Sequence, residues 1–268
     1  MSFYVNRKAA LEYLTSDLLA PTAHAFSTRY GGVSEGIWAS LNLGTHRGDR
    51  PKNVWENYRI LGDAVGFSPR QTVFTKQLHT DIVERVGKSE CGRGLVFPTA
   101  HACDGLITNE AGVVLTAFAA DCTPILLFDP VAGAIGAVHA GWRGTAAGIA
   151  AKAAEKMCAE LGATPETLRA AIGPCISQCC FETDGDVPEA MRNALGSAAE
   201  EYIRPVGQKY YANLKALNAL WLRRVGVTQI DISEDCTCCQ PERFWSHRCV
   251  GGQRGSLAAV IALKGDLR

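Results

Sequence analysis

Residues 113–140 limit what this chain can fold into more than any other part of the sequence. They form its most apolar stretch, but two aspartates and two prolines interrupt them: Asp121, Pro124, Asp129 and Pro130. A membrane-spanning helix needs about 20 consecutive apolar residues, so this stretch is not a membrane span. Residues 125–128 and 134–138 are apolar runs on either side of a segment with turn residues, which predicts a β-hairpin.

The predicted hairpin determines which residues face each other. If the turn is centred between Pro130 and Val131, Cys122 and His139 are equally far from it and lie opposite each other. Opposite residues on one face have Cβ atoms roughly 4.5–5.5 Å apart. A thiol and an imidazole at that distance can share a metal ion or act as nucleophile and base. A packed core cysteine and a core histidine are the alternative interpretation.

Either chemistry needs a third partner, and His79 is the best candidate among the six histidines. It ends the segment 76–79, which we expect at a strand end beside polar residues. Spacing alone does not place His79 beside the other two.

The segment from Gly141 to Thr145 lies between a predicted strand and a predicted helix. Free backbone N–H groups at a helix start bind anions, and the guanidinium group of Arg143 could donate two further hydrogen bonds to an anion there. The glycines match neither a Walker A loop nor a dinucleotide fingerprint. A tight turn with a capping threonine is the alternative.

The chain has eleven cysteines, and its first thirty residues contain no apolar core with a basic flank. We therefore expect reduced thiols in a cytoplasmic protein. Cys236 and Cys239 have the CxxC spacing of a zinc site, but Cys175 and Cys179 do not pair as cleanly. The segment 173–182 is instead expected to form a turn that lines a cavity, with Glu182 as a candidate acid or base.

Helices and strands mix without a regular βαβ rhythm, which predicts an α+β fold with mixed sheets in one domain, residues 1–268. Helices are expected at 53–65, 144–161, 187–195 and 213–225, and strands at 72–75, 81–86, 106–108, 113–119, 125–128, 134–138, 168–172, 229–232 and 257–262. Residues 1–50 look rich in loops. The 27 basic and 27 acidic residues give no basic excess, so we do not expect a dedicated nucleic-acid binder.

Motifs spread over nearly the whole chain resemble the laccase-domain family, also called polyphenol-oxidase-like proteins or multi-activity purine nucleoside phosphorylases. These motifs are Arg29-Tyr30-Gly31-Gly32-Val33-Ser34, Ser40-Leu41-Asn42-Leu43-Gly44, Val54-Trp55-Glu56-Asn57-Tyr58-Arg59, Gln77-Leu78-His79, Ala120-Asp121-Cys122, His139-Ala140-Gly141-Trp142-Arg143-Gly144, Ile172-Gly173-Pro174-Cys175-Ile176 and Phe244-Trp245-Ser246-His247-Arg248. His247 departs from the pattern, since an aromatic residue is expected there.

The resemblance implies a layered α/β/β/α sandwich and a zinc (or copper) site formed by His79, Cys122 and His139. It also implies phosphorolysis of adenosine, inosine and methylthioadenosine to free base and (methylthio)ribose 1-phosphate, and deamination of adenosine to inosine. Purine nucleosides and phosphate are then the expected partners, and the sequence leaves the oligomeric state open.

The chemistry suits these ligands. Two histidines and one cysteine leave a fourth tetrahedral position open, where water becomes acidic enough to attack C6 of adenine. Asp121 and Glu182 are the candidate proton shuttles. We expect phosphate to be held by arginines, the candidates being Arg143, Arg59 and Arg248.

Three alternatives remain. A copper-dependent polyphenol oxidase with a multicopper cluster needs many imidazoles, and the six histidines are scattered. A metal-free hydrolase would use Cys122 as nucleophile, His139 as base and Asp121 or His79 as orienting group. A non-catalytic protein would bind purines without turnover.

Overall fold

The computed structural model describes residues 3–265, whose strands form two six-stranded sheets and one small sheet. The first sheet has the order β1 (Phe3–Lys8), β2 (Leu11–Ser16), β3 (Thr22–Ser27), β15 (Leu257–Leu263), β7 (Val114–Ala119), β4 (Thr72–Val73). The second has the order β14 (Gln229–Ile232), β10 (Arg169–Ile172), β8 (Thr123–Asp129), β9 (Ala134–Ala140), β6 (Gly105–Thr108), β5 (Val83–Arg85). The small sheet contains β11 (Glu182–Thr183), β13 (Lys209–Ala212) and β12 (Ile203–Val206).

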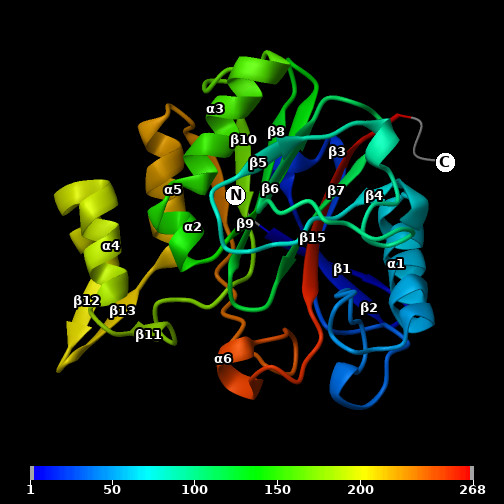
Figure 1. Cartoon of the computed structure of the whole chain (residues 1–268), viewed down its shortest axis with the longest axis horizontal. Helices are drawn as coiled ribbons and strands as arrows, with labels where there is room; N and C mark the ends of the chain where they lie inside the picture. Colours follow the sequence, from blue (N-terminus) through cyan, green and yellow to red (C-terminus); the bar gives the residue numbers. More distant parts are fainter. Residues whose placement is uncertain (1–2, 266–268) are drawn as a thin grey trace.

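The two large sheets pack face to face and are covered by helices on their outer faces (Figure 1). Alternate residues of strands in both sheets, such as Leu115 and Leu126, share one core between the sheets. Helix α1 (Pro51–Val65) covers the first sheet, while α3 (Ile149–Leu161) and α5 (Leu214–Arg224) cover the second. This confirms the α+β fold and its four layers.

Three further helices complete the description: α2 (Trp142–Ala146), α4 (Asp186–Leu195) and α6 (His247–Val250). Helix α4 packs with the small sheet around a separate apolar cluster. No helix in residues 3–265 combines the length and apolar character needed to cross a membrane.

The prediction that residues 1–50 are rich in loops is wrong for residues 3–27, most of which form β1, β2 and β3. Strand β1 is an edge strand whose residues are exposed or half-buried, so it lacks the apolar alternation that marks a strand. Strand β3 buries three polar residues, Thr22, His24 and Ser27, and each of them forms a hydrogen bond with the protein. The hydrophobic pattern therefore does not reveal these strands.

The prediction of a single helix over residues 144–161 is also wrong. The chain forms α2 and α3, separated by Gly148, whose φ of 76° lies in the left-handed region. A glycine adopts this conformation at little cost and so ends one helix and begins the next.

The β8–β9 hairpin exists, but its register differs by two residues from the one predicted. Asp129 pairs with Ala134, and His139 pairs with Pro124 rather than with Cys122. The carboxylate of Asp129 accepts hydrogen bonds from the N–H groups of Val131 and Ala132, which stabilises a four-residue turn. Cys122 thus lies just before β8, outside the paired residues.

Candidate metal centre and adjoining cavity

His79, Cys122 and His139 nevertheless come together. Their ligand atoms all lie within 4.8 Å of one another, and Cys122 Sγ lies 3.6 Å from His79 Nε2. The two imidazole rings meet edge to face, with centroids 4.9 Å apart and an angle of 79° between their planes. We call these three residues the trio.

Two of the three positions depend on unusual backbone conformations. His79 has a φ of 63°, and Asp121, directly before Cys122, has a φ of 90°. Non-glycine residues persist in this region only where surrounding contacts hold them, and such positions cluster at functional sites. Asp121 is held by the Thr237 hydroxyl and the Arg248 N–H, each donating to one of its carboxylate oxygens at 2.6 Å.

Asp104 is one of the site residues that the sequence analysis missed. Its carboxylate accepts a hydrogen bond from His139 Nδ1 at 2.8 Å and from the N–H groups of His79 and Thr80 at 3.0 and 2.7 Å. One buried carboxylate therefore orients both histidines and leaves His139 Nε2 to face the other members of the trio. Carboxylates behind metal-binding histidines commonly have this role. The only sequence signal is an aspartate directly before a buried strand, which is not specific.

The charges in the trio stabilise one another. Burial raises the pKa of Cys122, but the charge of His139 and hydrogen bonds from both imidazoles outweigh it and bring the pKa to about 6. Burial lowers the pKa of His139, yet Cys122 and Asp104 raise it to about 9. Cys122 is therefore readily ionised, as a metal ligand or a nucleophile must be.

Gly141 leaves the space that the trio needs. A Cβ atom at this position would lie 2.5 Å from His79 Cδ2 and 3.3 Å from Cys122 Sγ. Only a residue without a side chain allows the imidazole and the sulfur to approach here.

The donor set fits one borderline-soft cation such as zinc, with two nitrogens and one sulfur as ligands and one position left for substrate. It does not fit a cluster of four coppers. The other four histidines lie apart from the trio's ligand atoms: His24 on β3, His46 in the cavity wall, His101 beside Glu84 and His247 on α6. At most one copper ion would find suitable ligands at the trio.

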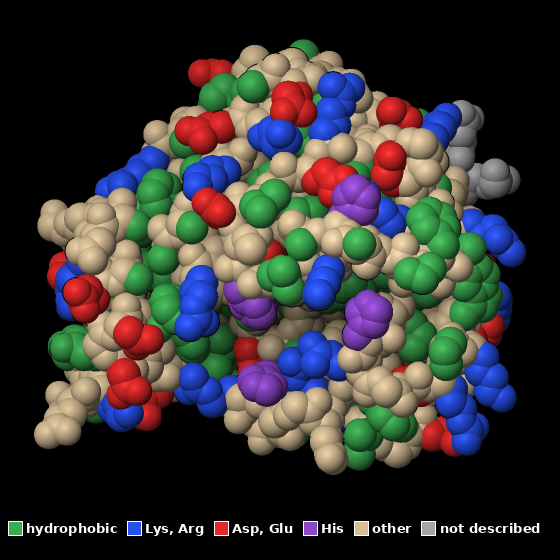
Figure 2. Space-filling model, viewed as in Figure 1, with side chains coloured by type: hydrophobic (Ala, Val, Ile, Leu, Met, Phe, Trp, Pro, Cys, Tyr) green, Lys and Arg blue, Asp and Glu red, His purple; other side chains and the backbone are tan. Residues whose placement is uncertain are grey.

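The trio forms part of the wall of a cavity of about 380 Å³, a size suited to a small metabolite. Histidine and basic side chains surround a hollow in the middle of this face of the molecule (Figure 2). The wall contains Arg47, Lys76 and Arg254 but no acidic residue, and Phe118 adds an aromatic ring. These properties favour an anionic ligand with a planar part.

Arg254 is the basic residue best placed to hold an anion. Its side chain is buried, and its Nε atom has no hydrogen-bond partner among residues 3–265. Burial and the nearby charge of Arg47 lower the pKa of Arg254 to about 10. Neither arginine forms an ion pair with a carboxylate of the described residues, although the nearby charges of Asp121 and Cys122 favour the charged form of Arg254. Two guanidinium groups that no carboxylate contacts therefore meet at the cavity. The two residues stand far apart in the sequence, and no motif indicates either.

The structure does not bring the three predicted arginines into this cavity. Arg143 is exposed, with its guanidinium 4.2 Å from the Trp142 ring centroid. Arg59 pairs with Glu56 and Asp63 on the outer face of α1. Arg248 donates hydrogen bonds to the carbonyl oxygens of Cys180 and Glu182, because α6 lies against that loop.

The candidate proton shuttles also lie outside the cavity wall. Both carboxylate oxygens of Asp121 accept hydrogen bonds from neighbouring loops, so Asp121 positions Cys122. Glu182 is exposed and accepts a hydrogen bond from the Tyr211 hydroxyl. His247, the residue that departs from the family pattern, is exposed on α6 and does not line the cavity.

Comparison with known proteins decides the family. The sequence profile described as multi-copper polyphenol oxidoreductase laccase matches residues 23–264. The chain belongs to this family.

The chain is similar to the purine nucleoside phosphorylase YlmD of Geobacillus stearothermophilus, with 39% identity over 240 residues, or 88% of each chain. The purine nucleoside phosphorylase YlmD of Bacillus subtilis is 35% identical, over 89% of this chain and 87% of its own. The crystal structure of the Geobacillus YlmD superposes with a TM-score of 0.92 at 35% identity, covering 98% of this chain and all of that one.

Proposed function

We propose that this chain is a zinc-dependent purine nucleoside phosphorylase. It splits adenosine, inosine and methylthioadenosine into free base and (methylthio)ribose 1-phosphate, and it deaminates adenosine to inosine in the cytoplasm. The observation that carries the proposal is the trio beside a cavity whose wall contains two arginines, Arg47 and Arg254, that form no ion pair with a carboxylate of the described residues. The names of the YlmD relatives support the phosphorylase part.

His79, Cys122 and His139 would hold the zinc ion, and Asp104 would keep His139 in the tautomer that presents Nε2 to it. A zinc ion bound there supplies a Lewis acid with one free coordination position. This is the position expected at a catalytic rather than a structural site.

Arg254 and Arg47 would hold the phosphate in phosphorolysis. A phosphate oxygen forms a bond to C1′ of the ribose while the bond from C1′ to N9 breaks, and the electron pair leaves with the purine, which takes up a proton. The two guanidinium groups orient the attacking anion and compensate its charge. The Phe118 ring offers a face for the base.

A metal-free cysteine hydrolase is the second candidate, and one observation favours it. The low pKa of Cys122 and the high pKa of His139 are those of a thiolate–imidazolium pair, which also acts in cysteine nucleophiles. Metal dependence separates the two functions. A phosphorylase of the proposed kind loses its activity to a chelator and regains it with zinc, whereas the hydrolase keeps it.

The test is a product assay on adenosine with the wild-type chain and with Cys122→Ala. We expect the wild type to release adenine only with phosphate present, and inosine with or without phosphate. Cys122→Ala should lose both products, while Cys158→Ala, a half-buried cysteine on α3, should keep both. Wild-type phosphorolysis by Cys122→Ala would exclude the proposed site. If the wild type performs phosphorolysis but forms no inosine, only the proposed deamination is excluded.

A further inference from the structure

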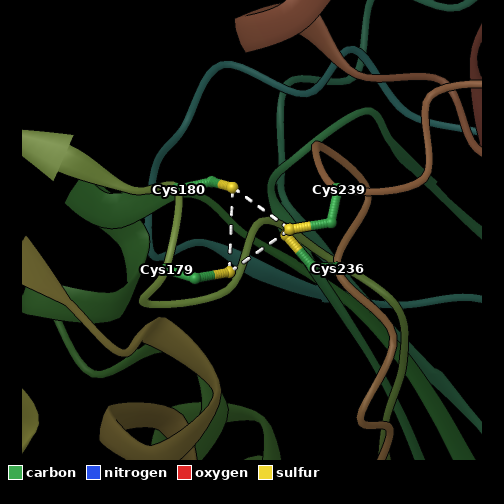
Figure 3. A group of neighbouring side chains, drawn as sticks. All are labelled: Cys179, Cys180, Cys236 and Cys239. Carbon is green, nitrogen blue, oxygen red and sulfur yellow. Dashed lines mark hydrogen bonds between the residues drawn. The ribbon is translucent and has the colours of Figure 1, made fainter.

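Four cysteine sulfurs come together in a second group, separate from the trio (Figure 3). Cys179 and Cys180 come from the loop after β10, and Cys236 and Cys239 come from the loop after β14. Their sulfurs all lie within 4.8 Å of one another. Sequence spacing favoured a cavity-lining turn, and it offered Cys175 and Cys179 as partners for Cys236 and Cys239 that do not pair as cleanly. The structure instead brings them to Cys179 and Cys180.

The distances within this group suit one shared ion. The sulfurs of Cys179, Cys180 and Cys239 form a triangle with sides of 3.7, 3.5 and 3.4 Å. Zinc–sulfur bonds of about 2.3 Å in a tetrahedron place neighbouring sulfurs roughly 3.8 Å apart. A disulfide uses only two sulfurs at a time and does not account for a compact set of four.

The backbone of the two loops also supports this arrangement. Cys236 and Cys239 have CxxC spacing, and the Ser177 N–H donates to Cys236 Sγ at 3.3 Å. Cys175 and Cys236 form a parallel backbone bridge that fixes the two loops side by side. Cys175 itself is buried and accepts a hydrogen bond from the Thr123 hydroxyl, so it is not part of the group.

We propose that Cys179, Cys180, Cys236 and Cys239 bind one zinc ion through four thiolates, as a closed structural site. Soft sulfur ligands in a tetrahedral set select zinc among the common divalent cations. Each thiol gives up its proton as it binds the ion. This proposal does not depend on the proposed function, because it shares no ligand with the trio.

The site has a consequence for the trio. The Ile176 N–H donates to the Asp121 carbonyl oxygen at 3.0 Å, and the Thr237 hydroxyl donates to the Asp121 carboxylate at 2.6 Å. Each of these residues belongs to one of the two cysteine-bearing loops, and Asp121 directly precedes Cys122. An ion that ties the two loops together therefore also fixes the backbone from which Cys122 projects.

The test is the zinc content of the full chain, purified under reducing conditions without a metal-binding tag. We expect about two zinc ions per wild-type chain, one at each site. Cys239→Ser and Cys122→Ala should each lose one ion, and the double variant should lose both. Cys249→Ser is the matched control, because this exposed cysteine lies nearby but outside the group, and it should keep both ions.

A zinc content in Cys239→Ser equal to that of the wild type would overturn the proposal. Cobalt titration of Cys122→Ala serves if Cys239→Ser does not fold. We expect one bound cobalt with the intense charge-transfer absorption of four thiolates, and the lack of that band would also overturn the proposal. A wild-type chain that holds one zinc ion, lost in Cys239→Ser but kept in Cys122→Ala, would count against the proposed function and not against the four-cysteine site.

Discussion

Gly141→Ala is expected to disable the trio while leaving the fold intact. The new Cβ would lie 2.5 Å from His79 Cδ2, whereas carbon atoms in contact lie about 3.5–4.0 Å apart, so the imidazole must retreat by roughly 1 Å. A metal ligand tolerates displacements of only about 0.2 Å. Misplacement by 1 Å costs roughly 100-fold in rate, or about 2.7 kcal/mol.

The backbone itself accepts alanine, since Gly141 has a φ of −69°. His79 is exposed and its ring can move outward, so the melting temperature should change little. The assay is adenosine phosphorolysis together with zinc content at the trio. Gly185→Ala is the matched control, because a Cβ there meets nothing within 4 Å and its φ is −68°. If Gly141→Ala matched Gly185→Ala in zinc content and turnover, the steric argument for the trio would be refuted.

Three further predictions concern single residues. Asp104→Asn should weaken zinc binding at the trio by roughly 10–100-fold, measured by chelator competition, and an unchanged affinity would show that Asp104 does not orient His139. Arg254→Met should raise the KM for phosphate by roughly 10–100-fold, because a hydrogen bond to a charged group contributes about 1.5–3 kcal/mol. The control Arg143→Ala, at an exposed residue, should leave this KM unchanged. Equal effects of the two substitutions would show that Arg254 does not bind phosphate. Burial lowers the pKa of His24 to about 4. Between pH 6.5 and 4, His24 is therefore protonated in the unfolded chain but stays neutral in the folded chain. The free energy of unfolding should then fall by up to about 3 kcal/mol between pH 6.5 and 4. His24→Gln should flatten this loss in denaturant titrations, and an unaltered pH dependence would contradict the argument.

The local sequence pattern predicts those elements whose side chains divide clearly between core and solvent. Helix α1 has Val54, Tyr58 and Leu61 on its buried face, and the pattern finds it within two residues of its start. Strand β3 is stabilised partly through hydrogen bonds of buried polar residues, and such contacts become visible only once the sheet is formed.

The site residues also divide into those that sequence motifs indicate and those that only the folded structure reveals. The family motifs contain His79, Cys122 and His139, and the structure brings them together although the predicted register was wrong. The left-handed turn at Asp121 brings Cys122 to His139 instead, and that turn depends on Thr237 and the Arg248 N–H from distant loops. Asp104, Arg47 and Arg254 reach the site only through long-range packing, so no local pattern could have indicated them.

Anomalous diffraction at the zinc absorption edge, from crystals of the full chain, tests the central claim most directly. We predict a peak within bonding distance of His79 Nε2, Cys122 Sγ and His139 Nε2, with one side open to the cavity. Strong zinc density elsewhere in the crystal and none among these three atoms would contradict the assignment of the trio as the metal centre.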